Sequence, residues 1–189
     1  MVDNFEELLR ETKTLSERRV TLREFKLDDC NDVLVYGSDE LSLKYAAWGG
    51  VKTLEESVKN MYEYYFVTPG VYAIELNETH KCIGGIDIRI IPQHGKARLG
   101  FILNRHYWNK GYMTEALSVV LSFCFKTLEV NRVEATYFAG NIGSGRVMEK
   151  CGMTFEGIAK EQEKVKGVFR DAVHYGILKS QWITHSRPI

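Results

Sequence analysis

The sequence predicts an α/β (α+β) fold, with a mixed, mostly antiparallel sheet of about seven strands flanked by helices. Two observations predict it. Alternating segments in the middle of the chain follow one another with short, turn-rich connections, and after them come a strand, an amphipathic helix and a short helix between strands. Short connections favour antiparallel neighbours, whereas a strand–helix–strand unit favours a parallel pair. The sheet is therefore expected to contain both directions.

The first part of the chain is predicted to be mostly helical. Its elements are a short helix from Asp3 to about Thr12, a strand over 19–25, a helix from Asp28 to Tyr36 and a helix from Thr53 to Phe66. Two of these helices begin at a capping-box pattern, Asp3 with Glu6 and Thr53 with Glu56. Gly37 ends the second helix, because glycine tolerates the left-handed conformation common after a helix. The segment 37–52 is expected to be a loop.

The rest of the chain is predicted to alternate strands with two helices. The elements are strands over 71–76, 81–91 and 96–103, a helix over 114–128, a strand over 132–139, a short helix from Ser144 to Lys150, and strands near 155–165 and 169–178. The connections NETH and PQHG are rich in turn residues, so the first three strands form an antiparallel meander.

Length and composition fit one soluble domain. The chain has 189 residues, of which 44% are hydrophobic, and its 25 basic side chains balance 25 acidic ones. Formal neutrality predicts no general attraction to nucleic acid. The N-terminal segment MVDNFEELLRE carries acidic residues where a secretory signal is apolar, and no apolar run reaches the roughly eighteen residues of a membrane span. We therefore expect a cytoplasmic protein without membrane contact.

Cysteine and histidine follow no ligand pattern. Cys30, Cys82, Cys124 and Cys151 are scattered without a C-x-x-C pair, and the five histidines lack metal-ligand spacing. We expect reduced, mostly packed thiols and no metal.

The stretch W108-N-K-G-Y-M-T-E-A-L117 places a basic, glycine-containing turn directly before a helix. The first four N–H groups of a helix lack intrahelical partners, and the helix dipole adds positive charge there, so such a junction suits a phosphate. Most glycine turns of this kind are only connectors. The turn alone is therefore a weak signal.

Five ordered segments give the chain a resemblance to the GNAT superfamily of N-acetyltransferases, and most of all to its Rim-type branch, which acetylates the N-termini of ribosomal proteins. The segments are Y107-W-N-K-G-Y-M-T-E-A-L117, N131-R-V-E134, N141-I-G-S-G-R-V-M-E-K-C-G-M153, F155-E-G157 and D171-A-V-H-Y-G-I-L-K-S-Q-W182. The similarity is dense over 96–182 and looser over 18–95. It implies one domain over 18–182, with a helical extension over 1–17 and a tail over 183–189.

The resemblance implies acetyl-CoA as the acyl donor and a central strand pair that splays apart. The pyrophosphate is expected on the turn, and the thioester arm along the splayed strand. The expected cofactor contacts are the backbone of Asn109, Lys110, Gly111, Tyr112, Met113 and Thr114, the strand amides of Ile102 and Leu103, and the side chains of Asn141 and Arg146. The turn departs from the wider family at Trp108, Asn109 and Met113, which binding through backbone N–H groups tolerates.

The resemblance also implies a catalytic group at the second helix. Ser144 is expected to protonate the departing thiolate, with Asn141 bonding cofactor or substrate, although Asn-x-x-Ser before a helix is also the pattern of an ordinary N-cap. Glu163 matches a carboxylate that acts with this serine in ribosomal-protein acetyltransferases. Asp87 is expected to face the cleft, and Arg98 stands where the family often has a glutamate. Both carboxylates also suit ordinary solvated or paired strand positions.

Three functions follow from the resemblance. The first is acetyl transfer to a protein N-terminal α-amino group, most simply of a ribosomal protein. The second is acetylation of a small amine such as a polyamine, an amino acid or an aminoglycoside, and the third is a non-catalytic acyl-CoA sensor. Trp48, in the acceptor-side loop, is expected either to contact substrate or to belong to the core. A homodimer is a reasonable expectation, because exposed strands often pair.

Overall fold

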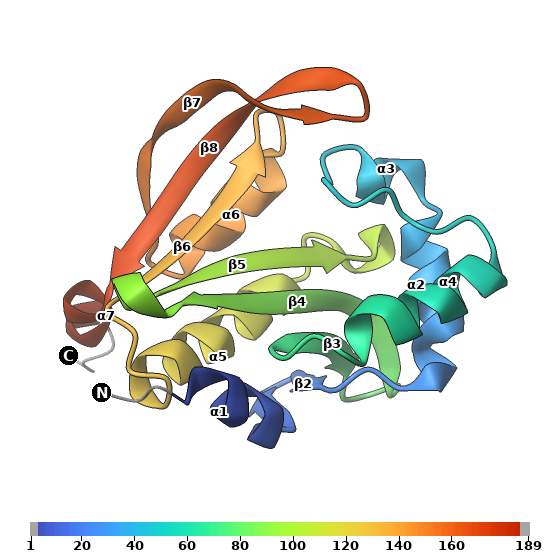
Figure 1. The fold of residues 1–189 in the computed structure, drawn as a ribbon, viewed down its shortest axis with the longest axis horizontal. Coiled ribbons are helices and arrows are strands. Elements are labelled where there is room, and N and C mark those ends of the chain that lie inside the picture. The colour runs from blue at the N-terminus through green and yellow to red at the C-terminus, as the bar shows by residue number, and fades with distance from the viewer. Residues whose placement is uncertain (1–3, 186–189) are drawn as a thin grey trace.

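The structure is a computed structural model and describes residues 4–185. Its centre is an eight-stranded sheet with the order β1-β2-β3-β4-β5-β6-β8-β7 (Figure 1). All neighbouring strands are antiparallel except β5 and β6, which are parallel. The predicted α/β fold with a mixed, mostly antiparallel sheet is therefore confirmed.

The strands agree closely with the sequence pattern. They are β1 (Thr14–Glu17), β2 (Val20–Arg23), β3 (Val71–Leu76), β4 (Lys81–Ile91), β5 (Lys96–Leu103), β6 (Arg132–Phe138), β7 (Thr154–Val165) and β8 (Val168–Leu178). The three strands of the middle meander begin and end where the alternation predicts. Strand β1 was not predicted, because it has only four residues and none of them is buried. It lies inside the segment 1–17 that was expected to be helical.

The helices include two short ones that the sequence did not predict. They are α1 (Phe5–Glu11), α2 (Cys30–Gly37), α3 (Glu40–Leu43), α4 (Leu54–Asn60), α5 (Tyr112–Lys126), α6 (Ile142–Lys150) and α7 (Lys179–His185). Helix α3 lies in the predicted loop, and α7 extends past the predicted domain end at residue 182. Thr53 caps α4 by accepting from the N–H of Glu56 at 3.1 Å. Asp3, proposed as the cap of the first helix, lies outside the described residues.

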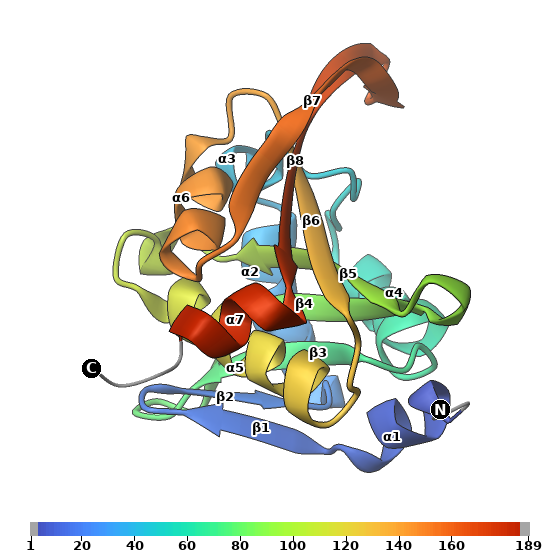
Figure 2. The ribbon, with the colours of Figure 1, turned by 90° about the vertical axis from the view of Figure 1, so that its left-hand side faces the viewer.

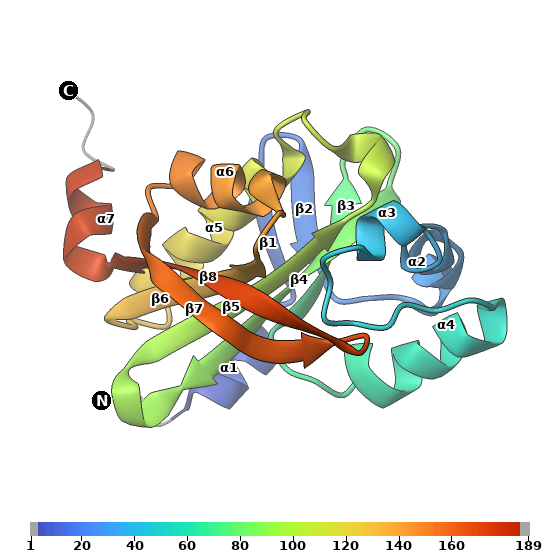
Figure 3. The ribbon, with the colours of Figure 1, turned by 90° about the horizontal axis from the view of Figure 1, so that it is seen from above.

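Alternate side chains of the central strands pack into two hydrophobic cores, one on each face of the sheet. Tyr72 and Ile74 of β3 lie in the larger core, which α5 completes, whereas Ala73 points into a second core with α2 and the residues after α4. Figure 3 shows α5 beside α6 and, at the opposite end, α2 beside α4. Helix α7 lies across the end of α5, where the rings of Phe125 and Trp182 are 5.4 Å apart (Figure 2). The sheet is thus held by helices on both faces.

Candidate functional site

Strands β5 and β6 separate partway along their length. They pair only from Lys96 opposite Arg132 to Leu99 opposite Ala135, while β5 continues to Leu103 and β6 to Phe138. Figure 1 shows the two strands diverging toward α3. Each keeps its other neighbour, β4 or β8, along the split. A fork therefore opens in the middle of the sheet, with backbone groups on its inner edges.

The β4–β5 register decides which N–H groups of β5 face the fork. The N–H of Asn104 donates to the carbonyl of Ile83 at 2.8 Å, so residues two apart, including Ile102, also point toward β4. By the same alternation, the N–H groups of Leu103 and Phe101 point away from β4. Of the two amides expected to face the cofactor, Leu103 faces the fork and Ile102 faces β4. Phe101 supplies a second donor that the sequence did not single out.

The turn before α5 is shaped for an anion. Asn109 and Gly111 both have positive φ angles, 59° and 86°, and left-handed residues of this kind are common in backbone turns that bind anions through their N–H groups. Gly111 is the N-cap of α5 and provides no side-chain cap. Within residues 4–185, no hydrogen bond occupies the N–H groups of residues 109–114. These free donors, together with the α5 dipole and the exposed Lys110, fit a diphosphate.

Arg19 supports this turn from the β1–β2 connection. Its guanidinium donates to the carbonyl of Lys110 at 3.0 Å and to Glu115 of α5 at 2.8 Å, and it lies 4.6 Å from the centre of the Tyr112 ring. The hydrogen bond to Glu115 raises the pKa of Arg19. No local pattern predicts these contacts, because the partners are more than ninety residues apart in the chain. Met113 is buried, so its amide is the part that can face a ligand.

The start of α6 holds the two candidate catalytic residues. The Asn141 side chain accepts a hydrogen bond from the N–H of Ser144 at 3.4 Å, so Asn141 caps this helix. Ser144 is half-buried. Tyr137 lies on the part of β6 that no longer pairs with β5, and its hydroxyl is so close to Gly145 that a Cβ there would approach it to 2.8 Å. Tyr137 is thus a second hydroxyl near this turn, which the sequence did not indicate.

A contact between α5 and α6 sets the spacing between the turn and Ser144. The thiol of Cys151, at the end of α6, donates to the carbonyl of Thr114 in the first turn of α5 at 3.5 Å. Ser144 lies seven residues earlier on α6, about 10 Å away at the usual helical rise. A ligand bound at the α5 turn can therefore extend along the fork toward Ser144.

On the opposite face, a pair of oppositely charged side chains stands at the start of the fork. The Nε of Arg89 donates to Asp87 at 2.6 Å, and the second carboxylate oxygen of Asp87 lies over Gly100, where a side chain would overlap it. Although burial alone lowers the pKa of Arg89, its hydrogen bond to Asp87 and the nearby Glu163 raise it. The exposed Glu163 of β7 and Asp87 of β4 therefore act on the same guanidinium. Arg89 was not predicted from the sequence.

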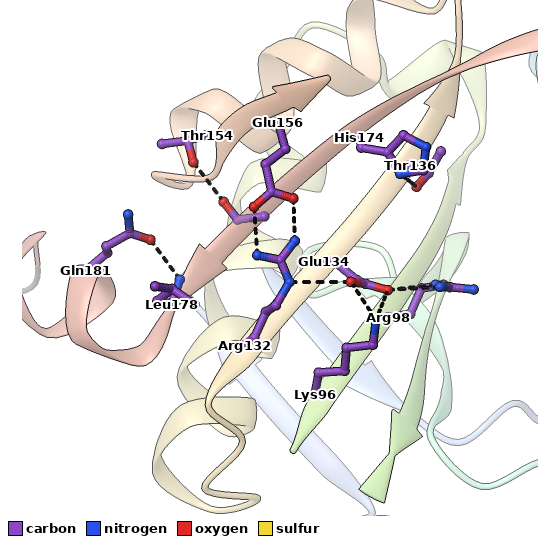
Figure 4. Close-up of polar contacts among 11 residues, drawn as sticks. Lys96, Arg98, Arg132, Glu134, Thr136, Thr154, Glu156, His174, Leu178 and Gln181 are labelled. Atoms are coloured by element: carbon purple, nitrogen blue, oxygen red, sulfur yellow. Dashed lines mark hydrogen bonds and ion pairs between the residues drawn. The ribbon is translucent and has the colours of Figure 1, made fainter. Parts of the chain in front are cut away.

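Next to this pair, a row of charged residues crosses the paired part of β5 and β6 (Figure 4). Arg98 donates to Glu134 at 2.9 Å, and Lys96 donates to the same carboxylate at 3.0 Å. Burial alone raises the pKa of Glu134, but these two hydrogen bonds lower it overall. Further along, His174 contacts both Thr136 and Gln162. Lys96 and Arg98 thus share an acidic partner, so this face has mixed charge.

The remaining predicted site residues lie outside these clusters. Trp48 is half-buried, with its ring 6.2 Å from that of Tyr36, and it packs against the second core. Arg146 is exposed on α6. Among the helices of residues 4–185, none is long and apolar enough to cross a bilayer.

Comparisons with known proteins agree with this geometry. A family model described as "Acetyltransferase (GNAT) domain" matches residues 19–154. The uncharacterized N-acetyltransferase YnaD of Bacillus subtilis is 30% identical over 89% of this chain and 98% of its own. A GNAT-family acetyltransferase structure from Bacillus anthracis has a TM-score of 0.81 and 29% identity, over 88% of this chain and 99% of that one. The [ribosomal protein uS5]-alanine N-acetyltransferase of Escherichia coli is 30% identical over a shorter part, 44% of this chain and 43% of its own.

Proposed function

The chain belongs to the GNAT family of acetyl-CoA-dependent N-acetyltransferases, and from this we propose that its acceptor is the α-amino group of a protein N-terminus, of the ribosomal-protein type. The observation that carries the proposal is the pairing of Asp87 with Arg89 at the start of the fork. The local similarity to the uS5-alanine N-acetyltransferase points to the same acceptor class.

The proposed roles are assigned to the turn before α5, the inner edge of the fork and the start of α6. The free amides of residues 109–114 bind the diphosphate of acetyl-CoA, and the amides of Phe101 and Leu103 bind along the thioester arm. When bound, acetyl-CoA supplies the acetyl group and a thiolate as leaving group. Ser144 donates a proton toward that thiolate, and Asn141 holds the turn in which Ser144 lies. The amine approaches from the side of Asp87 and Glu163.

The mixed charge of the acceptor side disfavours a polyamine. A polycation needs several carboxylates whose charges are not already neutralised. Here Asp87 is paired with Arg89, and Glu134 with Arg98 and Lys96. A peptide N-terminus carries one positive charge beside polar backbone groups, which suits alternating acidic and basic side chains.

The lack of a free, buried carboxylate at this position also favours an α-amino acceptor. Only a neutral amine attacks, and an α-amino group with a pKa of about 7.7–8.0 is roughly one-tenth neutral at pH 7. A lysine side chain, with a pKa of about 10.4, is only about 0.04% neutral at that pH. An α-amino group therefore needs much less help from a base, and a water molecule relaying the proton to Asp87 or Glu163 suffices.

An acceptor screen that follows release of free CoA tests the proposal. The acceptors are peptides with a free N-terminal alanine or serine, the same peptides with an acetylated N-terminus and one internal lysine, polyamines, amino acids and aminoglycosides. We expect release with the free peptides and none with the blocked ones. Release with a polyamine or an aminoglycoside instead would assign a small-molecule acceptor. Binding of acetyl-CoA without release from any acceptor would identify a sensor.

We also propose that the protein forms a homodimer through β7. This strand is an edge of the sheet, and its Phe155 and Ile158 are about half exposed. An edge strand that exposes apolar side chains can pair with a second copy. Light scattering during size-exclusion chromatography gives the mass directly, and a monomeric mass at micromolar concentration would contradict this part of the proposal.

A further inference from the structure

The carboxylate of Glu115 lies close to the proposed diphosphate site and would repel a bound anion. Its carboxylate lies in the first turn of α5, directly after the free amides of residues 109–114, and its side chain is only 17% exposed. A carboxylate at a helix N-terminus is favourable for the helix itself. It also repels any second anion bound there, and repulsion between partly buried charges is screened less than at an open surface.

Arg19 forms hydrogen bonds with both oxygens of the Glu115 carboxylate. Its Nε bonds one Glu115 oxygen at 2.8 Å, and its own backbone N–H bonds the other at 3.2 Å. The same guanidinium holds the carbonyl of Lys110 at 3.0 Å, which fixes the orientation of the Lys110–Gly111 peptide unit. In a trans peptide the N–H points opposite to the carbonyl, so the N–H of Gly111 points away from Arg19.

We propose that Arg19 is a positioning residue for acetyl-CoA: it neutralises Glu115 and orients the Lys110 peptide so that the turn accepts a diphosphate. The inference rests on this turn being the cofactor site of the proposed transferase. It adds a residue from the β1–β2 connection, far in sequence from the turn and outside the segments over which the family resemblance is dense. Arg19 acts through Glu115 and Lys110, without touching the phosphates.

Calorimetric titration with CoA, in the absence of any acceptor, tests this inference. We expect Arg19→Gln to weaken CoA binding about tenfold, because an unpaired Glu115 then faces the phosphates. Arg18→Gln is the matched control, since it removes the same charge from the same connection, and the largely exposed Arg18 side chain pairs with Glu17 at 3.8 Å, away from the turn. The control should bind CoA within about twofold of the unsubstituted protein.

A double substitution separates positioning from direct contact. If Arg19 acts by neutralising Glu115, then Arg19→Gln with Glu115→Gln recovers most of the lost affinity, to within about threefold of Glu115→Gln alone. A double variant as weak as Arg19→Gln would overturn the inference, because neutralising Glu115 would then not be the role of Arg19. Equal binding by Arg19→Gln and Arg18→Gln would also overturn it.

Two further measurements keep the test decisive. Thermal unfolding without ligand checks that each variant is folded. Should Arg19→Gln not fold, Arg19→Lys replaces it, and we expect about threefold weaker binding because one ammonium cannot hold both partners as the planar guanidinium does. Unchanged binding by Arg19→Lys would then contradict the inference. The acceptor assignment is tested separately, because CoA binding requires no acceptor: a failed acceptor screen leaves these titrations unaffected.

Discussion

The N-termini of α5 and α6 differ in how their backbone N–H groups are satisfied. Helix α6 is capped by its own sequence, through Asn141. Helix α5 begins at Gly111 without a side-chain cap, and the N–H groups of residues 109–114 have no partner within residues 4–185. The first N–H groups of a helix lack intrahelical partners and can bind an anion. The α5 end therefore offers free donors to the proposed diphosphate, whereas at α6 the N–H of Ser144 already donates to Asn141.

The two helix ends are therefore expected to act through different groups, the backbone at α5 and side chains at α6. In the diphosphate site proposed at α5 the backbone is the functional group, so its conformation should matter more than its side chains. At α6 the N–H of Ser144 is taken by Asn141, and the proposed chemistry there comes from a side chain, with the hydroxyls of Ser144 and Tyr137 nearby. Substitutions at the two ends should consequently affect different measurements.

The largest effect is expected from Ser144→Ala. Loss of a general acid typically lowers the rate by 10²–10⁴, so we expect kcat to fall about 100-fold. Affinity for CoA and the free energy of unfolding should remain unchanged, because the cap of α6 is Asn141 rather than Ser144. Steady-state kinetics with an accepted peptide and calorimetry with CoA provide the two measurements.

Tyr137→Phe is the matched control, since it removes a second hydroxyl near the same turn. We expect it to retain at least about half of the activity if Ser144 is the proton donor. If Tyr137→Phe loses turnover and Ser144→Ala does not, the tyrosine is the donor. The contrast between the two helix ends would then remain, with a different side chain at α6.

A smaller effect is expected when the same glycine substitution is made at each helix end. At Gly111, with φ at 86°, alanine costs about 1–2 kcal/mol of left-handed strain and its Cβ approaches Arg19 to 3.1 Å. Gly143 in α6 has no positive φ, and the nearest atom to an added Cβ is 3.8 Å away. We expect Gly111→Ala to weaken CoA binding about tenfold and Gly143→Ala to stabilise the fold by up to about 1 kcal/mol.

These two substitutions are compared by CoA titration and by urea unfolding. Equal CoA affinities for Gly111→Ala and Gly143→Ala would mean that the conformation of the turn does not matter for binding. The assignment of the α5 end as the diphosphate site would then be wrong.

Much of the fold was predictable because its signals are local. The alternation in 71–103 set three strand boundaries, and the glycine turn followed by an apolar stripe indicated the strand–helix junction. Thr53 was also predictable as a cap, because capping involves residues only three apart. The sequence missed β1 and α7, which are short and weakly patterned, and so their stability depends on the sheet and the helix against which they pack.

The candidate site was less predictable, because its geometry depends on contacts between distant segments. The turn itself is continuous in sequence and was identified. Arg19 reaches it from more than ninety residues away, and Arg89 was not distinguishable from any exposed strand arginine. Likewise, only the pairing register shows that the amide of Leu103 faces the fork and that of Ile102 does not. Sequence pattern predicts which residues share a strand face, but not which distant groups meet there.

Asn141→Ala tests the capped end directly. Loss of an asparagine N-cap costs about 1 kcal/mol, and we expect this decrease in the free energy of unfolding in urea. Thr53→Ala, which removes the cap of α4, should cost about the same. Only Asn141→Ala should also lower kcat, because Ser144 lies in the turn that Asn141 holds. The expected decrease is several-fold, which is the rate change that corresponds to the free energy of the cap. Equal kinetics for the two variants would show that capping is the whole role of Asn141.

The smallest effect is expected from Asn109→Gly at the uncapped end. Asn109 has a φ of 59°, a conformation that glycine adopts without strain, so the turn should keep its shape. Relief of this strain and the greater freedom of the unfolded chain oppose each other, and stability should change by less than about 0.5 kcal/mol. Because the N–H group is retained, CoA affinity should stay within about twofold. A tenfold loss would show that the asparagine side chain binds the ligand, and that the α5 end, like the α6 end, depends on a side chain for its function.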